Sequence, residues 1–230
     1  MSTSPNLVAV VVAAGSSRRM GFDKLTASLL GRPLITHALE AFQRCGDVDA
    51  VVLVCGSERV AEFTKLAEHF PKVNKVVPGG RERVDSVLRG LEAFGSPEPI
   101  FVAVHDGARP LITPEAISMC YKQAVEFGAA VCAEPETDTL HRVDGDLCTV
   151  ENVPRKNLWR MQTPQITEFS LLLSLIREMQ EGGNLVTDEI SVLMRSGGKA
   201  RVVETPDWNF KVTYPRDLQL AETVLKARMK

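Results

Sequence analysis

The sequence predicts an α/β protein built on a doubly wound, mostly parallel sheet. Short apolar, β-branched runs alternate with longer amphipathic segments along most of the 230 residues, and this alternation is typical of parallel strands connected by helices. The apolar runs are also apolar almost continuously rather than at every second residue. Strands that are covered on both faces have this composition, so helices are expected on each side of the sheet.

The alternation of strands and helices is regular in the first part of the chain. The expected strands lie at residues 7–13, 50–55, 73–77, 100–105 and 129–133. The expected helices lie between them, at residues 33–44, 58–69, 83–94 and 114–127. The last of these has a clear start, because Thr113 is a favourable cap and Pro114 fits the first helical position.

The pattern changes after Pro135. Residues 138–143 and 147–153 are strand-like, and the turn-forming residues 144–146 join them. We therefore expect a β-hairpin arm at about residues 137–156 that projects from the sheet. Helices are expected at 168–180, at 188–195 and from Pro215 onward, with a strand at 200–204. Without repeats or low-complexity segments, residues 1–230 are predicted to form one domain that carries this arm.

Composition excludes several classes of partner. The formal net charge is −2, so no global field attracts nucleic acid or an anionic membrane. No apolar run approaches the roughly 20 residues of a membrane span, and no signal peptide is recognisable. The five cysteines lack a C-x-x-C pair and are expected to be buried, reduced thiols. We expect a cytoplasmic protein in which any phosphate site is a local cluster of cations.

Such a cluster follows the first predicted strand. Ala13, Ala14, Gly15, Ser16 and Ser17 form a small-residue loop, and the cations Arg18, Arg19 and Lys24 come directly afterwards. Ligands of open α/β sheets bind beyond the carboxyl ends of the strands. The loop has neither the G-x-G-x-x-G nor the P-loop pattern, but its backbone N–H groups can approach an anion. A solvated basic turn is the alternative, and the position after strand one favours a nucleotide site.

A second cluster follows the predicted strand 100–105. It consists of Asp106, Gly107, Ala108 and Arg109, and it should face the same crevice because parallel strands end at one edge. His105 lies on an otherwise apolar strand, which favours a core histidine over a catalytic one. Asp106 is a candidate metal ligand or a candidate hydrogen-bond acceptor for substrate hydroxyls, although an isolated carboxylate makes a weak metal site.

Several short motifs occur in a specific order along the chain. They are Ala-Ala-Gly-x-x-x-Arg-Met at 13–20, Gly-Gly-x-x-Arg-x-x-Ser-Val at 79–87, Val-His-Asp-x-Ala-Arg-Pro at 104–110, Asp138-Thr139, Arg155 with Trp159, Gln-Thr-Pro-Gln at 162–165, Thr-Asp-Glu at 187–189 and Lys-Val-Thr at 211–213. Individually these motifs are weak. Together the chain resembles the 2-C-methyl-D-erythritol 4-phosphate cytidylyltransferases over about residues 8–221.

The resemblance implies a Rossmann-like nucleotidyltransferase fold and a reaction. The protein would transfer the cytidylyl group of CTP to methylerythritol phosphate, releasing pyrophosphate, in non-mevalonate isoprenoid synthesis. The residues it assigns are catalytic cations (Arg19, Lys24, Arg155, Lys211), nucleotide-binding residues (Ala13, Ala14, Gly15, Ser16, Ser17, Gly80, Arg83, Ser86) and residues that bind the polyol phosphate (Asp106, Gly107, Arg109, Thr139, Thr163, Thr187). A homodimer is also implied, in which Thr139 and Arg155 on the arm complete the partner's site.

The proposed chemistry fits these residue types. The second pKa of a phosphate monoester is about 6, so the nucleophile is largely dianionic at neutral pH and needs no general base. What the reaction requires is cations that let two anions approach each other. Mg²⁺ is expected to arrive with CTP, held largely by phosphate oxygens and water. No dedicated metal-ligand set is predicted.

Some alternatives remain open at this stage. Ser17 stands where the family often has glycine, and Arg81 where a shorter or acidic residue is common, so the chain departs from the family pattern at these two nucleotide-site positions. A ribitol 5-phosphate cytidylyltransferase is the nearest alternative, and a sugar-1-phosphate nucleotidyltransferase with another base is a wider one. A nicotinamide-dependent oxidoreductase and a non-catalytic nucleotide-binding module are disfavoured by the missing glycine fingerprint and by the retained cations. Thr187 is equally well explained as a helix cap, and Asp188 and Glu189 as favourable charges in a first helical turn.

Overall fold

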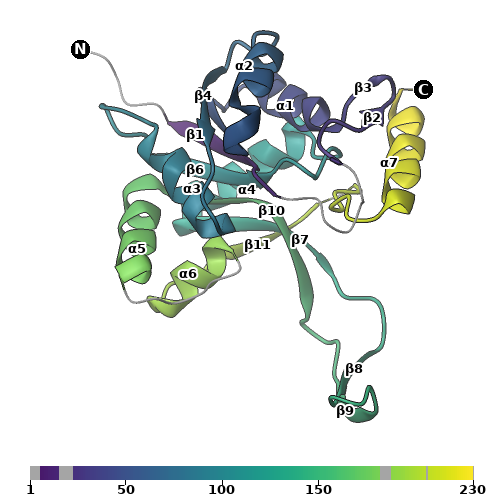
Figure 1. The fold of residues 1–230 in the computed structure, drawn as a ribbon. Coiled ribbons are helices and arrows are strands. Elements are labelled where there is room, and N and C mark those ends of the chain that lie inside the picture. Colours follow the sequence, from purple (N-terminus) through teal and green to yellow (C-terminus); the bar gives the residue numbers. More distant parts are fainter. Residues whose placement is uncertain (1–5, 16–22, 182–187, 206, 230) are drawn as a thin grey trace.

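A seven-stranded sheet forms the centre of the computed structural model, which describes residues 6–15, 23–181, 188–205 and 207–229 (Figure 1). Its strands are β1 (Leu7–Ala13), β4 (Ala50–Cys55), β5 (Val73–Pro78), β6 (Phe101–Asp106), β7 (Ala129–Pro135), β10 (Trp159–Glu168) and β11 (Arg201–Glu204). Their order across the sheet is β11-β7-β10-β6-β1-β4-β5. All neighbours pair in parallel except β10, which is antiparallel to both β6 and β7.

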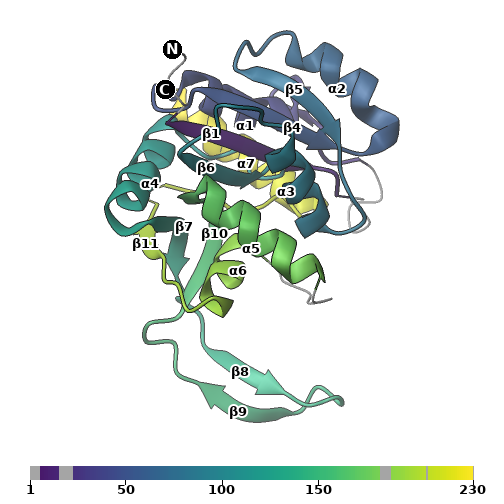
Figure 2. The same cartoon turned by 90° about the vertical axis from the view of Figure 1, so that its left-hand side faces the viewer.

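Helices cover both faces of this sheet (Figure 2). The helices are α1 (Leu34–Arg44), the short 3₁₀ helix η1 (Ser57–Arg59), α2 (Val60–Ala67), α3 (Arg83–Glu92), α4 (Pro114–Phe127), α5 (Phe169–Glu181), α6 (Glu189–Arg195) and α7 (Pro215–Arg228). Residues of α1, α2, α4 and α7 belong to one buried apolar cluster, whereas those of α3, α5 and α6 belong to the other.

The central strand β1 shows why the sheet needs two helical layers. Leu7, Ala9 and Val11 pack into one cluster, while Val8 and Val10 pack into the other. All five side chains are fully buried. Because successive side chains of a strand point to opposite faces, a strand without any polar alternation must be covered on both sides. The predicted doubly wound, mostly parallel fold is thereby confirmed.

The elements predicted from the sequence are all present, with ends that agree within two residues. The helix α4 also begins as predicted, since the Thr113 side chain accepts a hydrogen bond from the backbone N–H of Ala116 and Pro114 takes the first helical position. Two features were missed. One is the small antiparallel pair β2 (Ser28–Leu29) and β3 (Arg32–Pro33), and the other is β10 in the middle of the sheet.

The predicted hairpin consists of β8 (Leu140–Val143) and β9 (Thr149–Val153), which pair only with each other. It projects away from the sheet, beyond the ends of β7 and β10 (Figures 1 and 2). Apolar side chains on it are exposed, most of all Leu147 at 81%. An isolated two-stranded hairpin is marginally stable in water, so this arm has little of its own to hold it together.

Two further expectations concern thiols and membranes. Four cysteines are buried as predicted, but Cys148 is exposed near the tip of the hairpin, where no core exists to cover it. Among the residues that the structure describes, none of the helices has both the length and the apolar composition of a membrane span.

Candidate functional site

A pocket of about 360 Å³ opens at the carboxyl ends of β1 and β6. Segments that are far apart in the sequence line it: the end of β1 with the loop that follows, the start of α3, the end of β6, and the strand-free segment before α7. This is the edge at which ligands of open α/β sheets bind. Nine predicted site residues contribute to its wall, namely Ala13, Ala14, Gly15, Lys24, Gly80, Arg83, Ser86, Asp106 and Lys211.

The first loop forms one side of the pocket. Ala13, Ala14 and Gly15 line it, and they also line an adjoining lobe of about 260 Å³ that reaches Gly56 and Arg59. The predicted residues Ser16, Ser17 and Arg19 lie outside the described residues.

The start of α3 approaches this loop closely. A Cβ at Gly79 would lie 2.5 Å from Cβ of Ala14, so only glycine permits this approach. The Ser86 hydroxyl accepts a hydrogen bond from the Gly80 N–H at 3.1 Å and donates one to the Glu82 carbonyl at 3.2 Å. Ser86 therefore shapes the glycine turn, which leaves backbone rather than side chains facing the pocket.

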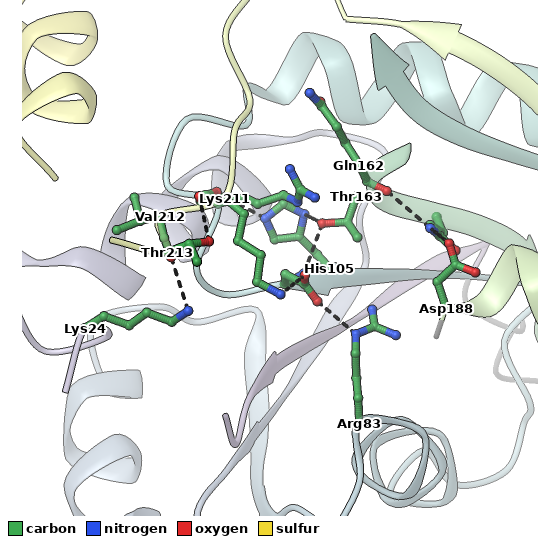
Figure 3. A network of polar contacts seen from close by, with 12 residues as sticks. Lys24, Arg83, His105, Gln162, Thr163, Asp188, Lys211, Val212 and Thr213 are labelled. Carbon is green, nitrogen blue, oxygen red and sulfur yellow. Dashed lines mark hydrogen bonds and ion pairs between the residues drawn. The ribbon is translucent and has the colours of Figure 1, made fainter. Parts of the chain in front are cut away.

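Two lysines from distant segments face the pocket (Figure 3). The Lys24 ammonium donates to the Val212 carbonyl at 3.2 Å. Lys211, the residue before Val212, donates to Oδ2 of Asp106 at 2.7 Å. Lys24 follows β1 and Lys211 precedes α7, so the fold alone brings these two predicted cations to one wall.

Asp106 is the electrostatic centre of the site. Its two carboxylate oxygens accept from Arg83 Nε at 3.0 Å and from Lys211 Nζ at 2.7 Å. Burial alone would raise the pKa of the Asp106 carboxyl, but the charges of Arg83 and Lys211 outweigh this effect and hold that pKa well below its usual range. Asp106 is thus a permanent anion that orients two cations.

Arg83 is held from its other side by Glu189. Its guanidinium donates two hydrogen bonds to the Glu189 carboxylate, at 2.6 Å and 3.1 Å, across 106 residues of sequence. Burial disfavours the charged form of Arg83, but Glu189 and then Asp106 raise its pKa above the ordinary arginine value. Arg83 lines the predicted nucleotide site with its charge already paired to two carboxylates.

Glu189 is the functional residue whose role the sequence did not reveal. It lies in the first turn of α6, as the helix-charge interpretation expects, but only 3% of it is exposed and its carboxylate binds Arg83. Asp188 caps α6 instead, accepting from the Ser191 N–H at 2.9 Å. The sequence motif that contains Glu189 is the Thr-Asp-Glu triplet, and this motif does not indicate an ion pair with a residue as distant in sequence as Arg83.

His105 is a core residue, as expected. It is fully buried and stacks edge-on against Phe42, with ring centroids 5.1 Å apart. Burial lowers its pKa to about 4, so the imidazole is neutral at physiological pH. Its Nδ1 is hydrogen-bonded to the Thr163 hydroxyl at 3.1 Å, and that hydroxyl also accepts from the Asp106 N–H at 3.1 Å.

Three predicted substrate residues do not line the pocket. Thr163 is 3% exposed and braces the Asp106 backbone from behind. Gly107 is enclosed, since a Cβ there would lie 2.7 Å from Cδ1 of Ile35. Arg109 donates to the Asn209 carbonyl at 2.9 Å and so fixes the segment that carries Lys211. In this single chain these residues support the wall of the pocket from within.

The remaining predicted residues lie elsewhere. Thr139 and Arg155 are exposed on the arm, where Arg155 donates to the carbonyl of Thr137, and neither lines the pocket. Thr187 lies outside the described residues. Of the three predicted catalytic cations that the structure describes, the pocket of one chain therefore contains two, Lys24 and Lys211.

A second groove, of about 570 Å³, is larger than the pocket at the sheet edge. It lies between the start of α1 and the helix α2 and is lined by residues such as Arg32, Lys65 and His69. None of the predicted site residues within the described ranges lines it. Size alone would select this groove, but the convergence of cations from distant segments identifies the smaller pocket as the candidate active site.

The chain is similar to proteins of one known family. A family model described as 2-C-methyl-D-erythritol 4-phosphate cytidylyltransferase matches residues 7–227. A curated protein of that name from Bacillus licheniformis is 39% identical over 228 residues, covering 96% of each chain. Another, from Halalkalibacterium halodurans, is 36% identical and covers 94% of this chain and 95% of its own.

Solved structures with the same description have the same fold. The Francisella tularensis protein superposes with a TM-score of 0.82 at 26% identity, covering 95% of this chain and 99% of its own. The Thermus thermophilus protein gives a TM-score of 0.78 at 28% identity, covering 94% and 98%.

Proposed function

Because the chain belongs to the 2-C-methyl-D-erythritol 4-phosphate cytidylyltransferase family, we propose that the pocket at the carboxyl ends of β1 and β6 is its active site. The protein is a nucleotidyltransferase. It transfers the cytidylyl group of CTP to 2-C-methyl-D-erythritol 4-phosphate, which gives 4-diphosphocytidyl-2-C-methyl-D-erythritol and pyrophosphate in isoprenoid precursor synthesis. The observation that carries the site assignment is the convergence of Lys24, Lys211 and Asp106 on one pocket.

The pocket matches the charge of the reactants. Among the described residues, four basic ones line it, Lys24, Arg81, Arg83 and Lys211, against two acidic ones, Glu82 and Asp106. Such a surplus of cations stabilises a triphosphate and the charge that develops on its α-phosphorus as the acceptor oxygen attacks. Since Arg83 and Lys211 are already fixed by Asp106, little reorganisation is needed when the anions bind.

The acceptor needs no protein base. Its phosphate is largely dianionic at neutral pH, because the second pKa of a monoester is about 6. His105 could not serve as a base in any case, since Thr163, Phe42 and the Arg109 carbonyl enclose it. We therefore assign catalysis to charge stabilisation, with Lys24 at the α-phosphate and Lys211 orienting the acceptor.

Magnesium is proposed to enter with the nucleotide. Within the described part of the chain, no group of three or more histidine, cysteine or carboxylate side chains is arranged to hold a metal. Asp106 and Glu82 are the carboxylates of the pocket wall, and Asp106 already binds two cations. The metal would be held by phosphate oxygens and water, and it would neutralise charge on the triphosphate.

The exposed arm supports a shared site between two copies of the chain. Thr139 and Arg155 lie on the arm and do not line the pocket of their own chain. On the same hairpin the apolar side chains of Val143, Leu147 and Val150 are exposed. We propose a homodimer in which the arm of each subunit brings Arg155 to the pocket of the other. A cytoplasmic location is proposed as well, and the five unpaired thiols suit a reducing compartment.

The test follows pyrophosphate release from CTP and Mg²⁺ with methylerythritol phosphate, with ribitol 5-phosphate in a parallel reaction. Release with methylerythritol phosphate alone is expected. In the same assay Lys24→Ala should lower kcat by a factor on the order of 100, equivalent to about 3 kcal/mol of barrier. Lys122→Ala, an exposed lysine on α4, is the matched control and should keep full activity. A fully active Lys24→Ala variant would refute the assigned role of Lys24.

A further inference from the structure

Lys24 follows β1 in the sequence, and Asp23, the residue before Lys24, is bound to a residue at the start of α2. Asp23 makes an ion pair with the guanidinium of Arg59, which lies at the junction of η1 and α2. The two residues are 36 positions apart in sequence, and Arg59 also lines the lobe of about 260 Å³ that adjoins the pocket. The mechanism proposed above uses neither of them.

Asp23 also organises the turn that contains Lys24. Its carboxylate oxygens accept from the Leu25 N–H at 3.0 Å and from the Thr26 hydroxyl at 3.2 Å. Leu25 is 2% exposed, and its carbonyl accepts from the Ile35 N–H at 3.1 Å at the start of α1. The backbone on both sides of Lys24 is therefore fixed through one carboxylate.

Arg59 is a rigid partner for this carboxylate. Its guanidinium lies 4.3 Å above the ring of Phe63, which is fully buried. It also donates to Glu62 at 3.1 Å and 3.2 Å. Only 17% of the Arg59 side chain is exposed, so this is not a loose surface ion pair of the kind that contributes little.

We propose that the Arg59–Asp23 pair is a positioning device that aligns Lys24 with the α-phosphate of the nucleotide. The proposal rests on the assigned role of Lys24. Its physical basis is that a small displacement of a charge-stabilising group is costly for the rate, although substrate binding can persist. Arg59 and Asp23 are thus positioning residues, which act through Lys24.

The chain offers a matched control for the experiment. Glu62→Gln removes the second anion that Arg59 binds but leaves the link to Asp23 in place. Arg59→Gln and Asp23→Asn each break that link. Because neither side chain is fully buried and both substitutions keep a polar group of similar size, each variant is expected to fold, and thermal unfolding of each variant checks this.

The expected result is a fall in kcat of about tenfold in Arg59→Gln and in Asp23→Asn, with KM for CTP changed less than threefold and Glu62→Gln at wild-type activity. The double variant Arg59→Gln/Asp23→Asn should be no slower than either single one, because both break the same interaction. In a Lys24→Ala background, Arg59→Gln should lower kcat no further.

Two outcomes separate this proposal from the assigned role of Lys24. If Lys24→Ala is inactive while folded Arg59→Gln and Asp23→Asn keep wild-type kcat, the positioning role is overturned and Lys24 retains its assignment. A further loss from Arg59→Gln in the Lys24→Ala background would also overturn it, because Arg59 would then act independently of Lys24.

Discussion

The chemistry of single residues in this protein is governed by charges that are paired before any ligand binds. Arg83 lies between Asp106 and Glu189, and Lys211 is bound to the other oxygen of Asp106. Removing one member of such a buried set leaves an uncompensated charge, which commonly costs 3–5 kcal/mol. The same ion pairs therefore stabilise the fold and fix the positions of the side chains that line the pocket.

His105 gives the fold a predictable response to pH. Burial lowers its pKa to about 4, whereas a histidine in an unfolded chain titrates near 6.5. Between these values the unfolded chain binds more protons, so the free energy of unfolding rises with pH. His105 should contribute full stability above about pH 6.5, and roughly 3 kcal/mol of it should be lost as the pH falls to 4.

Urea denaturation between pH 4 and 7 measures this effect. His105→Asn retains a hydrogen-bonding group and cannot titrate, so its stability should depend less steeply on pH in that window. His69→Asn, at an exposed histidine just after the end of α2, should keep the wild-type slope. His37, whose pKa burial also lowers, adds a contribution of the same sign in all three proteins. An unchanged slope in His105→Asn would contradict the assignment.

For single residues, the sequence predicted which side chains belong to the site better than it predicted which side chains they contact. Lys24 and Asp106 were found because they follow strands, and strand ends meet at one edge, whereas Arg83 and Lys211 were assigned through the family resemblance. The pairing of Arg83 with Glu189 could not be predicted, since it depends on how α5, which packs against both α3 and α6, places the start of α6 near the start of α3. Thr163 and Arg109 were expected to contact substrate, but in this chain they brace Asp106 and the Lys211 segment from behind.

Among the elements, β10 shows where pattern analysis fails. It is the central antiparallel strand, yet it contains Pro164 and its register with β7 shifts between Met161 and Gln165. Proline lacks the N–H that a sheet ladder requires, so its presence argues against an interior strand. The bulge accommodates it, and bulges arise from the tertiary structure rather than from periodicity.

The end of α4 provides a test at the level of an element. Gly128 follows the helix with a φ of 81°, a left-handed conformation, and open space surrounds the position where a Cβ would be. Gly128→Ala should therefore lower the free energy of unfolding by about 1 kcal/mol through backbone strain alone. Gly95→Ala also meets open space, without a positive φ, and should change it by less than about 0.5 kcal/mol. Equal effects of the two substitutions in urea titrations would exclude the conformational explanation.

In the molecule as a whole, the proposed catalytic cations lie in two separate places. Lys24 and Lys211 line the pocket, whereas Arg155 belongs to the arm, which projects away from the sheet (Figure 1). The arm exposes apolar side chains and pairs with no other part of the described chain. Both observations are accounted for if two copies exchange arms, so that each active site combines residues of two subunits.

Subunit mixing tests this arrangement. Lys24→Ala and Arg155→Ala are each expected to be nearly inactive. If the arm completes the partner's site, a mixed dimer holds one intact site, formed by the pocket of one subunit and the arm of the other. Random reassociation of equal amounts should then recover about a quarter of wild-type activity. If activity does not exceed the mean of the two pure variants, although mixed dimers are present, the shared site is wrong.

A crystal structure with CTP and Mg²⁺ tests the central claim most directly, because it locates the nucleotide. We expect the triphosphate in the 360 Å³ pocket, with Lys24 in contact with an α-phosphate oxygen and the base beside Gly80 and Ser86. A nucleotide bound instead in the 570 Å³ groove between α1 and α2, with Lys24 and Lys211 making no contact to it, would contradict the assignment of the active site.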